Sequence, residues 1–168
     1  MEHRKKIRQA TLAAGVFVQA LESVGHQSFV MKFIGRRSIA FEGASGVGVR
    51  ESGVRYTVTK DWNESFQLAS RKMCGQHCPG GTPIGESIIV ATRAVLGREA
   101  NRRLVLVFSD GESGTAWDVR DLCEHIEKSH GVQIGFLGIS TDAVAALHHR
   151  FIIVDKIKDL AGATIAQL

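Results

Sequence analysis

The sequence predicts an α/β fold, a Rossmann-like, doubly wound and mostly parallel sheet flanked by helices. Segments of helical and of strand periodicity alternate along the chain, which is typical of this class. The run LVLVF at 104–108 is apolar throughout, as expected for a parallel strand covered on both faces. A chain of 168 residues with 44% hydrophobic residues suits one core, so we expect a single domain over 1–168.

The first part of the chain is expected to form one long helix and two strands. Apolar residues such as Leu12 and Val16 recur at roughly helical spacing, and Gly25 is a stop signal. Val54, Tyr56 and Val58 alternate on one face, which indicates an edge or half-buried strand. The predicted segments are a helix at 7–24, a buried strand at 28–35, an extended piece at 38–43, a loop at 43–53 and a strand at 54–60.

The second part alternates helices and strands more regularly. Thr82 and Pro83 predict a helix start with Thr82 as the N-cap and proline at the first helical position, and Glu86 in the first turn suits the helix dipole. The predicted segments are a helix at 63–73, a loop at 74–81, a helix to Leu96, a strand at 102–110, a helix at 116–129, a strand at 132–140, a short helix at 142–147, a strand at 151–155 and a closing helix to Leu168.

Composition argues against several classes of protein. The 21 basic residues are dispersed among 17 acidic ones without an aromatic-interleaved basic face, so we expect no nucleic-acid partner. The apolar runs are far shorter than the roughly 20 residues of a membrane span, and no signal-type apolar block follows the charged start. Three cysteines are too few for a disulfide framework. We therefore expect a cytoplasmic protein without a membrane partner.

Two polar segments are candidates for one site. SDGE at 109–112 follows an expected strand, and GGTP at 80–83 precedes a helix that can pack beside it. Ligands of open parallel sheets bind outside the carboxyl ends of the strands. The hydroxyl of Thr82 and the carboxylate of Asp110 are hard oxygen ligands suited to Mg²⁺ or Ca²⁺, not to zinc. The structural alternative is that Thr82 caps its helix and Asp110 caps the turn after its strand.

These residues resemble the von Willebrand factor type A domains (vWA domains). Their metal-ion-dependent adhesion site (MIDAS) combines an Asp-x-Ser-x-Ser loop after the first strand, a threonine in a later loop, and an aspartate in a strand-end Ser/Thr-Asp-Gly motif. GGTPIGES and RRLVLVFSDGES are similar to the second and third parts. The resemblance implies that Thr82 and Asp110 are metal ligands for Mg, Ca or Mn.

The resemblance is closest to the C-terminal vWA domain of cobaltochelatase CobT-like proteins. RYTVTKDWNESFQLASRKM, ATRAVLGREANRRLVLVFSDGES and HHRFIIVDKIKDLAGATIAQL follow that branch in order and spacing. The Asp-x-Ser-x-Ser motif is absent, because the chain begins at Met1 where that loop should end. We therefore expect a domain that is N-terminally incomplete, lacks the family's first central strand and three metal ligands, and binds metal weakly.

Other clusters have structural alternatives. Glu112 lies near Asp110, but an exposed turn carboxylate is the simpler interpretation. Cys74, His77 and Cys78 have no clear fourth partner for zinc, so we expect ordinary loop packing. The remaining predictions are that Cys123 belongs to the core and that the adjacent His148 and His149 are solvated.

The function that the resemblance implies is a non-catalytic protein-interaction domain, metal-assisted, acting with an AAA+ ATPase in a chelatase-like or remodelling complex. In this family a carboxylate of the partner often completes the coordination of the metal. Two alternatives stay open. One is a small Mg-dependent α/β enzyme on a phosphorylated or carboxylated ligand, with Thr82, Asp110 and Glu112 at its site. The other is a structural interaction domain that needs no metal.

Overall fold

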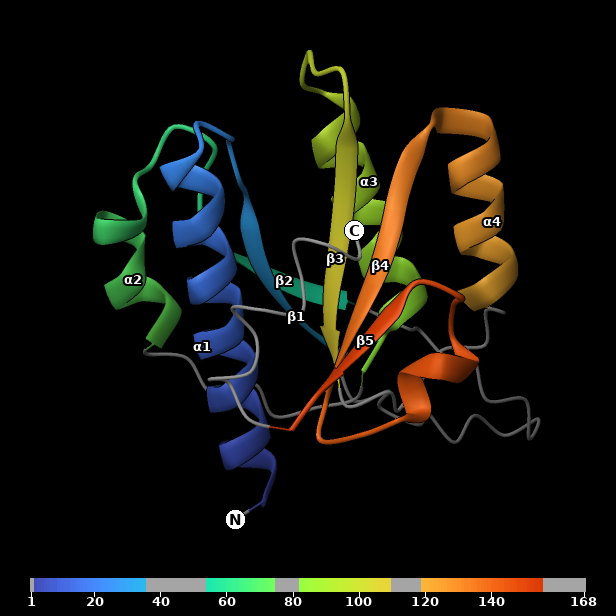
Figure 1. The fold of residues 1–168 in the computed structure, drawn as a ribbon, viewed down its shortest axis with the longest axis horizontal. Coiled ribbons are helices and arrows are strands. Elements are labelled where there is room, and N and C mark those ends of the chain that lie inside the picture. The colour runs from blue at the N-terminus through green and yellow to red at the C-terminus, as the bar shows by residue number, and fades with distance from the viewer. Residues whose placement is uncertain (1, 36–53, 75–81, 110–118, 156–168) are drawn as a thin grey trace, which may run out of the picture.

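The structure is a computed structural model that describes residues 2–35, 54–74, 82–109 and 119–155. Helices and strands alternate through most of these segments (Figure 1). The elements in chain order are α1 (Glu2–Ser23), β1 (Val30–Gly35), β2 (Val54–Lys60), α2 (Phe66–Cys74), α3 (Ile84–Leu96), β3 (Arg103–Ser109), α4 (Val119–His130), β4 (Val132–Ile139), the 3₁₀ helix η1 (Ala143–Ala146) and β5 (Phe151–Val154).

The strands form two sheets, and the larger one is parallel. In the three-stranded sheet the order is β3-β4-β5, and both pairs are parallel. The smaller sheet pairs β1 with β2 in antiparallel fashion. Parallel neighbours need a crossover, and here α4 connects β3 to β4 along the chain. The predicted α/β class with a mostly parallel, helix-flanked sheet is therefore confirmed.

Helices cover both faces of the parallel sheet. Val132, Ile134 and Phe136 of β4 pack into the larger core, which contains residues of α3 and α4. Leu137 and Ile139 belong to a second core with Ala10, Ala13 and Phe17 of α1. Because strand side chains alternate between faces, β4 supplies both cores and is almost entirely buried. This burial explains why the strand sequence is nearly continuous in apolar residues.

A cavity of about 1110 Å³ lies between the two sheets. Residues of α1, β1, α3 and β3 line it. Within the described residues, β1 pairs with β2 alone and β3 with β4 alone, so one edge of each faces this space without a strand partner.

Most predicted elements are present, with shifted ends. α1 begins earlier than the expected residue 7, and α2 begins later, at Phe66 instead of 63. The backbone N–H of Phe66 donates to the carboxylate of Glu22 on α1, at 3.0 Å to each oxygen. A tertiary contact thus sets the start of α2. The extended piece at 38–43, the loops at 43–53 and 75–81, and the closing helix lie outside the described residues.

Candidate functional site

Thr82 lies directly before α3 but does not cap it. The helix begins at Ile84, and Pro83 is its N-cap residue, with φ −80° and ψ 73° and no side-chain capping hydrogen bond. The prediction that Thr82 is the N-cap and Pro83 the first helical residue was wrong. The non-helical ψ of Pro83 delays the helix by one residue and leaves Thr82 outside the capping position. The hydroxyl of Thr82 is therefore not committed to the helix end.

Backbone and serine contacts hold this helix start in place. The backbone N–H of Ile84 donates to the carbonyl of Thr82 at 3.0 Å. The hydroxyl of Ser87 donates to the carbonyl of Pro83 at 2.7 Å, and the backbone N–H of Ser87 bonds the same oxygen at 3.1 Å. Ser87 is buried, so these bonds are shielded from water. The segment around Thr82 is thus anchored on α3 and can position a side chain.

The carboxyl end of β3 lies at the same cavity as Thr82. Ser109 is the last residue of β3 and is buried, and both Ser109 and Thr82 line the cavity between the sheets. Asp110 follows Ser109 in the chain, but Asp110 and Glu112 lie outside the described residues. Thr82 and the strand end before Asp110 therefore line one cavity. Coordination by the Asp110 carboxylate stays a prediction.

Glu86 in the first turn of α3 has an unusual environment. Its Oε2 atom is buried and has no hydrogen-bond partner among the described residues. From the sequence we expected Glu86 only to suit the helix dipole, and its place in the first turn agrees with that role. A buried carboxylate oxygen without a partner is costly unless a donor or cation serves it. Glu86 is thus the one acidic residue of α3, the helix that follows Thr82.

A second polar cluster joins α4 to the start of β5. The carboxylate of Glu127 accepts a hydrogen bond from the backbone N–H of Ile134 at 3.0 Å and pairs with the guanidinium of Arg150. The Nε2 atom of His148 lies 3.7 Å from Glu127 Oε2, and His149 stands beside His148 with ring centroids 4.1 Å apart. His148 is fully buried, whereas His149 is exposed. The prediction that both histidines are solvated was therefore wrong for His148.

The sequence did not predict this cluster. Glu127 lies far from the histidines along the chain, and only the packing of α4 against β4 and η1 brings them together. Burial lowers the pKa of His148, with a further lowering by neighbouring His149. The imidazole is thus favoured in its neutral form, packed near the ring of Phe136.

The hydrogen bonds of this cluster do not favour a metal ion, although three ligand atoms of Glu127, His148 and His149 lie within 4.8 Å of one another. The Nδ1 atom of His148 accepts a hydrogen bond from the backbone N–H of Arg150 at 3.2 Å. In the neutral imidazole the proton is then on Nε2, the nitrogen that faces Glu127. Arg150 already compensates the charge of the carboxylate. The cluster is a structural network that ties α4 to β5.

The cysteines divide between core and surface. Cys123 of α4 is fully buried, which confirms that it belongs to the core, and burial raises the pKa of its thiol to about 12. Cys74 is exposed at the end of α2. His77 and Cys78 lie outside the described residues, so the expected loop packing of this cysteine cluster stays a prediction. None of the described helices is long and apolar enough to cross a membrane.

A structure comparison gives the same fold class. The chain is similar to the structure of proximal thread matrix protein 1 from the mussel byssus, with a TM-score of 0.62 and 15% identity. The match covers 94% of this chain but 40% of the mussel protein, so the chain spans less than half of that relative. At this identity the likeness shows the fold alone. The comparison with curated proteins gives no match.

The family comparison extends over the whole sequence. The family model described as the VWA domain of the cobalamin biosynthesis protein CobT matches residues 1–168. The match spans the segments from which the resemblance was inferred, including those around Thr82 and Asp110. The chain therefore belongs to the CobT VWA domain family.

Proposed function

We propose that this chain is a non-catalytic protein-interaction domain that works with an AAA+ ATPase in a chelatase-like or remodelling complex. The observation that carries the proposal is the match of the CobT VWA family model to residues 1–168. An interaction domain fits this family because a vWA domain supplies a docking surface, while the ATPase supplies the energy for remodelling. In this proposal the domain acts in the cytoplasm and inserts no metal by itself.

The proposed docking centre is a divalent cation held by the Thr82 hydroxyl and the Asp110 carboxylate. Thr82 fits the role because its hydroxyl is not used to cap α3 and because it shares a cavity with the end of β3. Both oxygens are hard donors, which suit Mg²⁺, Ca²⁺ or Mn²⁺. Two protein ligands leave most of the coordination to water, so the affinity of the domain alone is expected to be weak. A carboxylate of the partner would complete the coordination.

Isothermal titration of Mg²⁺ and Mn²⁺ into the chain tests the metal part of this proposal. We expect weak, saturable binding that is lost in Asp110→Ala and reduced in Thr82→Ala. The matched control is Glu99→Ala, which removes an exposed carboxylate at the other end of β3 and should leave binding unchanged. Binding that survives Asp110→Ala would contradict the assignment of the ligand.

Copurification separates the three functional hypotheses. We expect an AAA+ ATPase to copurify with the wild-type chain and not with Asp110→Ala. If the ATPase is retained by this variant, the metal-independent interaction domain is correct. Turnover of a phosphorylated or carboxylated ligand by the purified chain without a partner would favour the Mg-dependent enzyme.

A further inference from the structure

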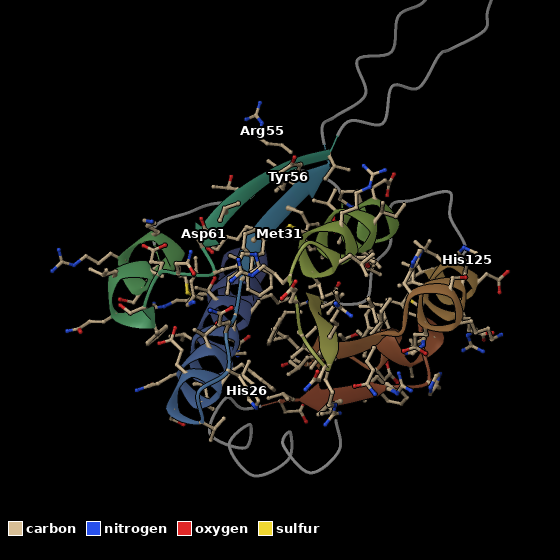
Figure 2. The ribbon with its side chains drawn as sticks, turned by 90° about the horizontal axis from the view of Figure 1, so that it is seen from above. His26, Met31, Arg55, Tyr56, Asp61 and His125 are labelled. Carbon is tan, nitrogen blue, oxygen red and sulfur yellow. The ribbon has the colours of Figure 1, made fainter. Side chains whose placement is uncertain are left out.

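The two-stranded sheet ends in a strand whose outer edge is open. Among the described residues β2 pairs with β1 alone, so the edge of β2 that faces away from β1 has no strand neighbour. Figure 2 shows β2 on the outer side of β1, with Arg55 pointing away from the molecule. None of the 7 residues of β2 lines the cavity between the two sheets, so this edge is separate from that space. A free edge presents backbone N–H and C=O groups that can pair with a further strand.

The exposed part of β2 is apolar on one face. The residues from Arg55 to Val58 are all exposed, and Tyr56 and Val58 are 52% and 43% exposed. Because side chains of a strand alternate between its faces, Val54, Tyr56 and Val58 share one face, and Arg55 and Thr57 share the other. Valine, tyrosine and threonine are residues that strands favour. An exposed apolar edge of this composition promotes pairing with another strand.

A bulge in β2 limits the length of edge that can pair regularly. Met31 of β1 pairs with Val58, whereas the preceding Val30 pairs with Lys60, so Thr59 is an extra residue of β2. Thr59 and Lys60 are also buried. A bulge bends its strand and increases the local twist, which interrupts regular pairing. The edge that can pair regularly therefore ends at Val58.

This regular part of the edge is complementary to itself. When two copies run antiparallel with Tyr56 opposite Tyr56, each Val54 lies opposite Val58 and each Arg55 lies opposite Thr57. Pairs of aromatic and of β-branched side chains stabilise a sheet, whereas like charges directly opposite destabilise it. This register joins the apolar faces of the two strands into one stripe and places no like charges opposite each other. A second copy therefore fits the edge.

Neighbouring registers are less favourable. In an antiparallel pair, residues whose backbone groups point outward must lie opposite one another, so the twofold axis passes through a residue and not between two residues. An axis at Arg55 would place the two guanidinium groups opposite each other. An axis at Thr57 would place Arg55 opposite Thr59, the buried residue of the bulge. The axis at Tyr56 avoids both.

We propose that a second copy of this chain pairs with the free edge of β2, across a twofold axis at Tyr56. The two-stranded sheets of the two copies then form one four-stranded antiparallel sheet. Most soluble oligomers are symmetric, and a twofold interface requires a patch that is complementary to itself. A single strand edge is small for an interface, so we expect a weak dimer that forms at high protein concentration. The inference goes beyond the proposed metal-assisted docking, because it uses neither Thr82 nor Asp110.

Sedimentation equilibrium of the full chain over a concentration series measures the association. We expect the average mass to rise from 18.3 kDa toward twice that value. Tyr56→Lys and Tyr56→Glu each place like charges at the axis and should weaken association at least about tenfold. An equimolar mixture of the two variants should associate more tightly than either alone, because lysine then lies opposite glutamate. The control Leu68→Lys adds the same charge at an exposed apolar position of α2 and should associate as the wild type does.

Cross-linking locates the twofold axis. The background for this experiment carries Cys74→Ser and Cys78→Ser, and Cys123 is buried. Tyr56→Cys should form a disulfide-linked dimer under mild oxidation, because the two Cα atoms at the axis are about 4.5–5.5 Å apart. Thr57→Cys should not, because its Cα and that of its copy are about 8 Å apart in this register, beyond the range of a disulfide.

Several results would overturn the proposal. It fails if the mass stays at 18.3 kDa at every concentration, if Tyr56→Lys associates as the wild type does, or if mixing the two charged variants does not increase association. It fails also if Thr57→Cys cross-links and Tyr56→Cys does not. Hydrogen exchange of β2 should slow as the concentration is raised, with little change in α4. Exchange that is already slow at low concentration would show that another segment of the chain covers this edge, which contradicts the proposal.

Discussion

Lys60 at the end of β2 forms an ion pair with Glu22 near the end of α1, with Nζ of the lysine 3.2 Å from Oε1 of the glutamate. Only 1% of the Lys60 side chain is exposed, and its Nζ also donates to the carbonyl of Ser28 at 2.9 Å. The same Glu22 carboxylate accepts the backbone N–H of Phe66. A buried lysine requires such partners. This pair therefore ties α1, α2 and the two-stranded sheet together.

Removing the charge of Glu22 should destabilise the fold. In Glu22→Gln the amide oxygen can still accept the N–H of Phe66, but Lys60 is left as a buried cation without its anion. We expect the free energy of unfolding to fall by about 2 kcal/mol, less than for a fully buried pair because Glu22 is 30% exposed. Urea denaturation measures this. The control Glu64→Gln breaks a pair with Lys72, which is 56% exposed, and should lower the free energy of unfolding less than Glu22→Gln does.

The same carboxylate should contribute to acid sensitivity. The hydrogen bond from the backbone of Phe66, and then the contact with Lys60, lower the pKa of Glu22 in the folded state. The folded pKa is thus below the unfolded one, so this stabilisation is present above about pH 4.3 and is lost as the pH falls through the folded value. The difference in free energy of unfolding between the wild type and Glu22→Gln should therefore decrease at acid pH. A difference that is constant from neutral pH to pH 3 would contradict this.

His148 should make the protein less stable below neutral pH. Burial lowers its pKa in the folded state, so the unfolded chain binds a proton first as the pH falls. Above about pH 6.5 the imidazole is neutral in both states, so its titration does not change the free energy of unfolding. The free energy of unfolding falls as the pH is lowered from there toward the folded pKa. His148→Gln lacks this titration. The stability advantage of the wild type over this variant should therefore shrink between pH 7 and 5, and parallel denaturation curves would refute the prediction.

Gly138 of β4 should not tolerate a side chain. A Cβ atom there would lie 2.5 Å from the carbonyl oxygen of Thr141 and 2.6 Å from Cγ2 of Val144. These distances require the turn after β4 to move, so Gly138→Ala should cost about 1–3 kcal/mol of unfolding free energy. Gly97→Ala is the matched control, because its nearest contact would be 3.6 Å. Thermal unfolding of both variants checks this. Equal midpoint temperatures would contradict the prediction, because they would show that the turn after β4 can move without loss of stability.

The two described cysteines should differ in reactivity. Burial raises the pKa of Cys123 to about 12, and the residue is 0% exposed, so the native protein should alkylate there very slowly. Cys74 is exposed and should react first with iodoacetamide. Peptide mapping after short treatment measures both sites, with the protein unfolded in guanidinium as the control. Labelling of Cys123 as fast as Cys74 in the native protein would contradict the assigned burial.

Local periodicity predicted most of the fold. The strands at 103–109 and 132–139 and the long first helix follow from apolar spacing, because a strand or helix buried on a given face repeats its apolar residues at a fixed period. The meeting of Thr82 and Asp110 at one site stays a prediction, because the structure shows only that Thr82 and Ser109 line the same cavity. Helix starts were less predictable. The start of α2 depends on Glu22, and the start of α3 depends on the backbone angles of Pro83.

The sequence by itself determined the class of the fold, the order of its elements, the family and the candidate oxygen ligands. Only the tertiary structure decided that Lys60 and His148 are buried, that Glu127 meets His148, and that β1 and β3 face one cavity. The sequence pattern indicates which face of a helix or strand is apolar, because that face is made by residues close together in the chain. Burial of a polar side chain and the pairing of a strand edge depend on residues distant in the chain, which become neighbours only when the elements pack.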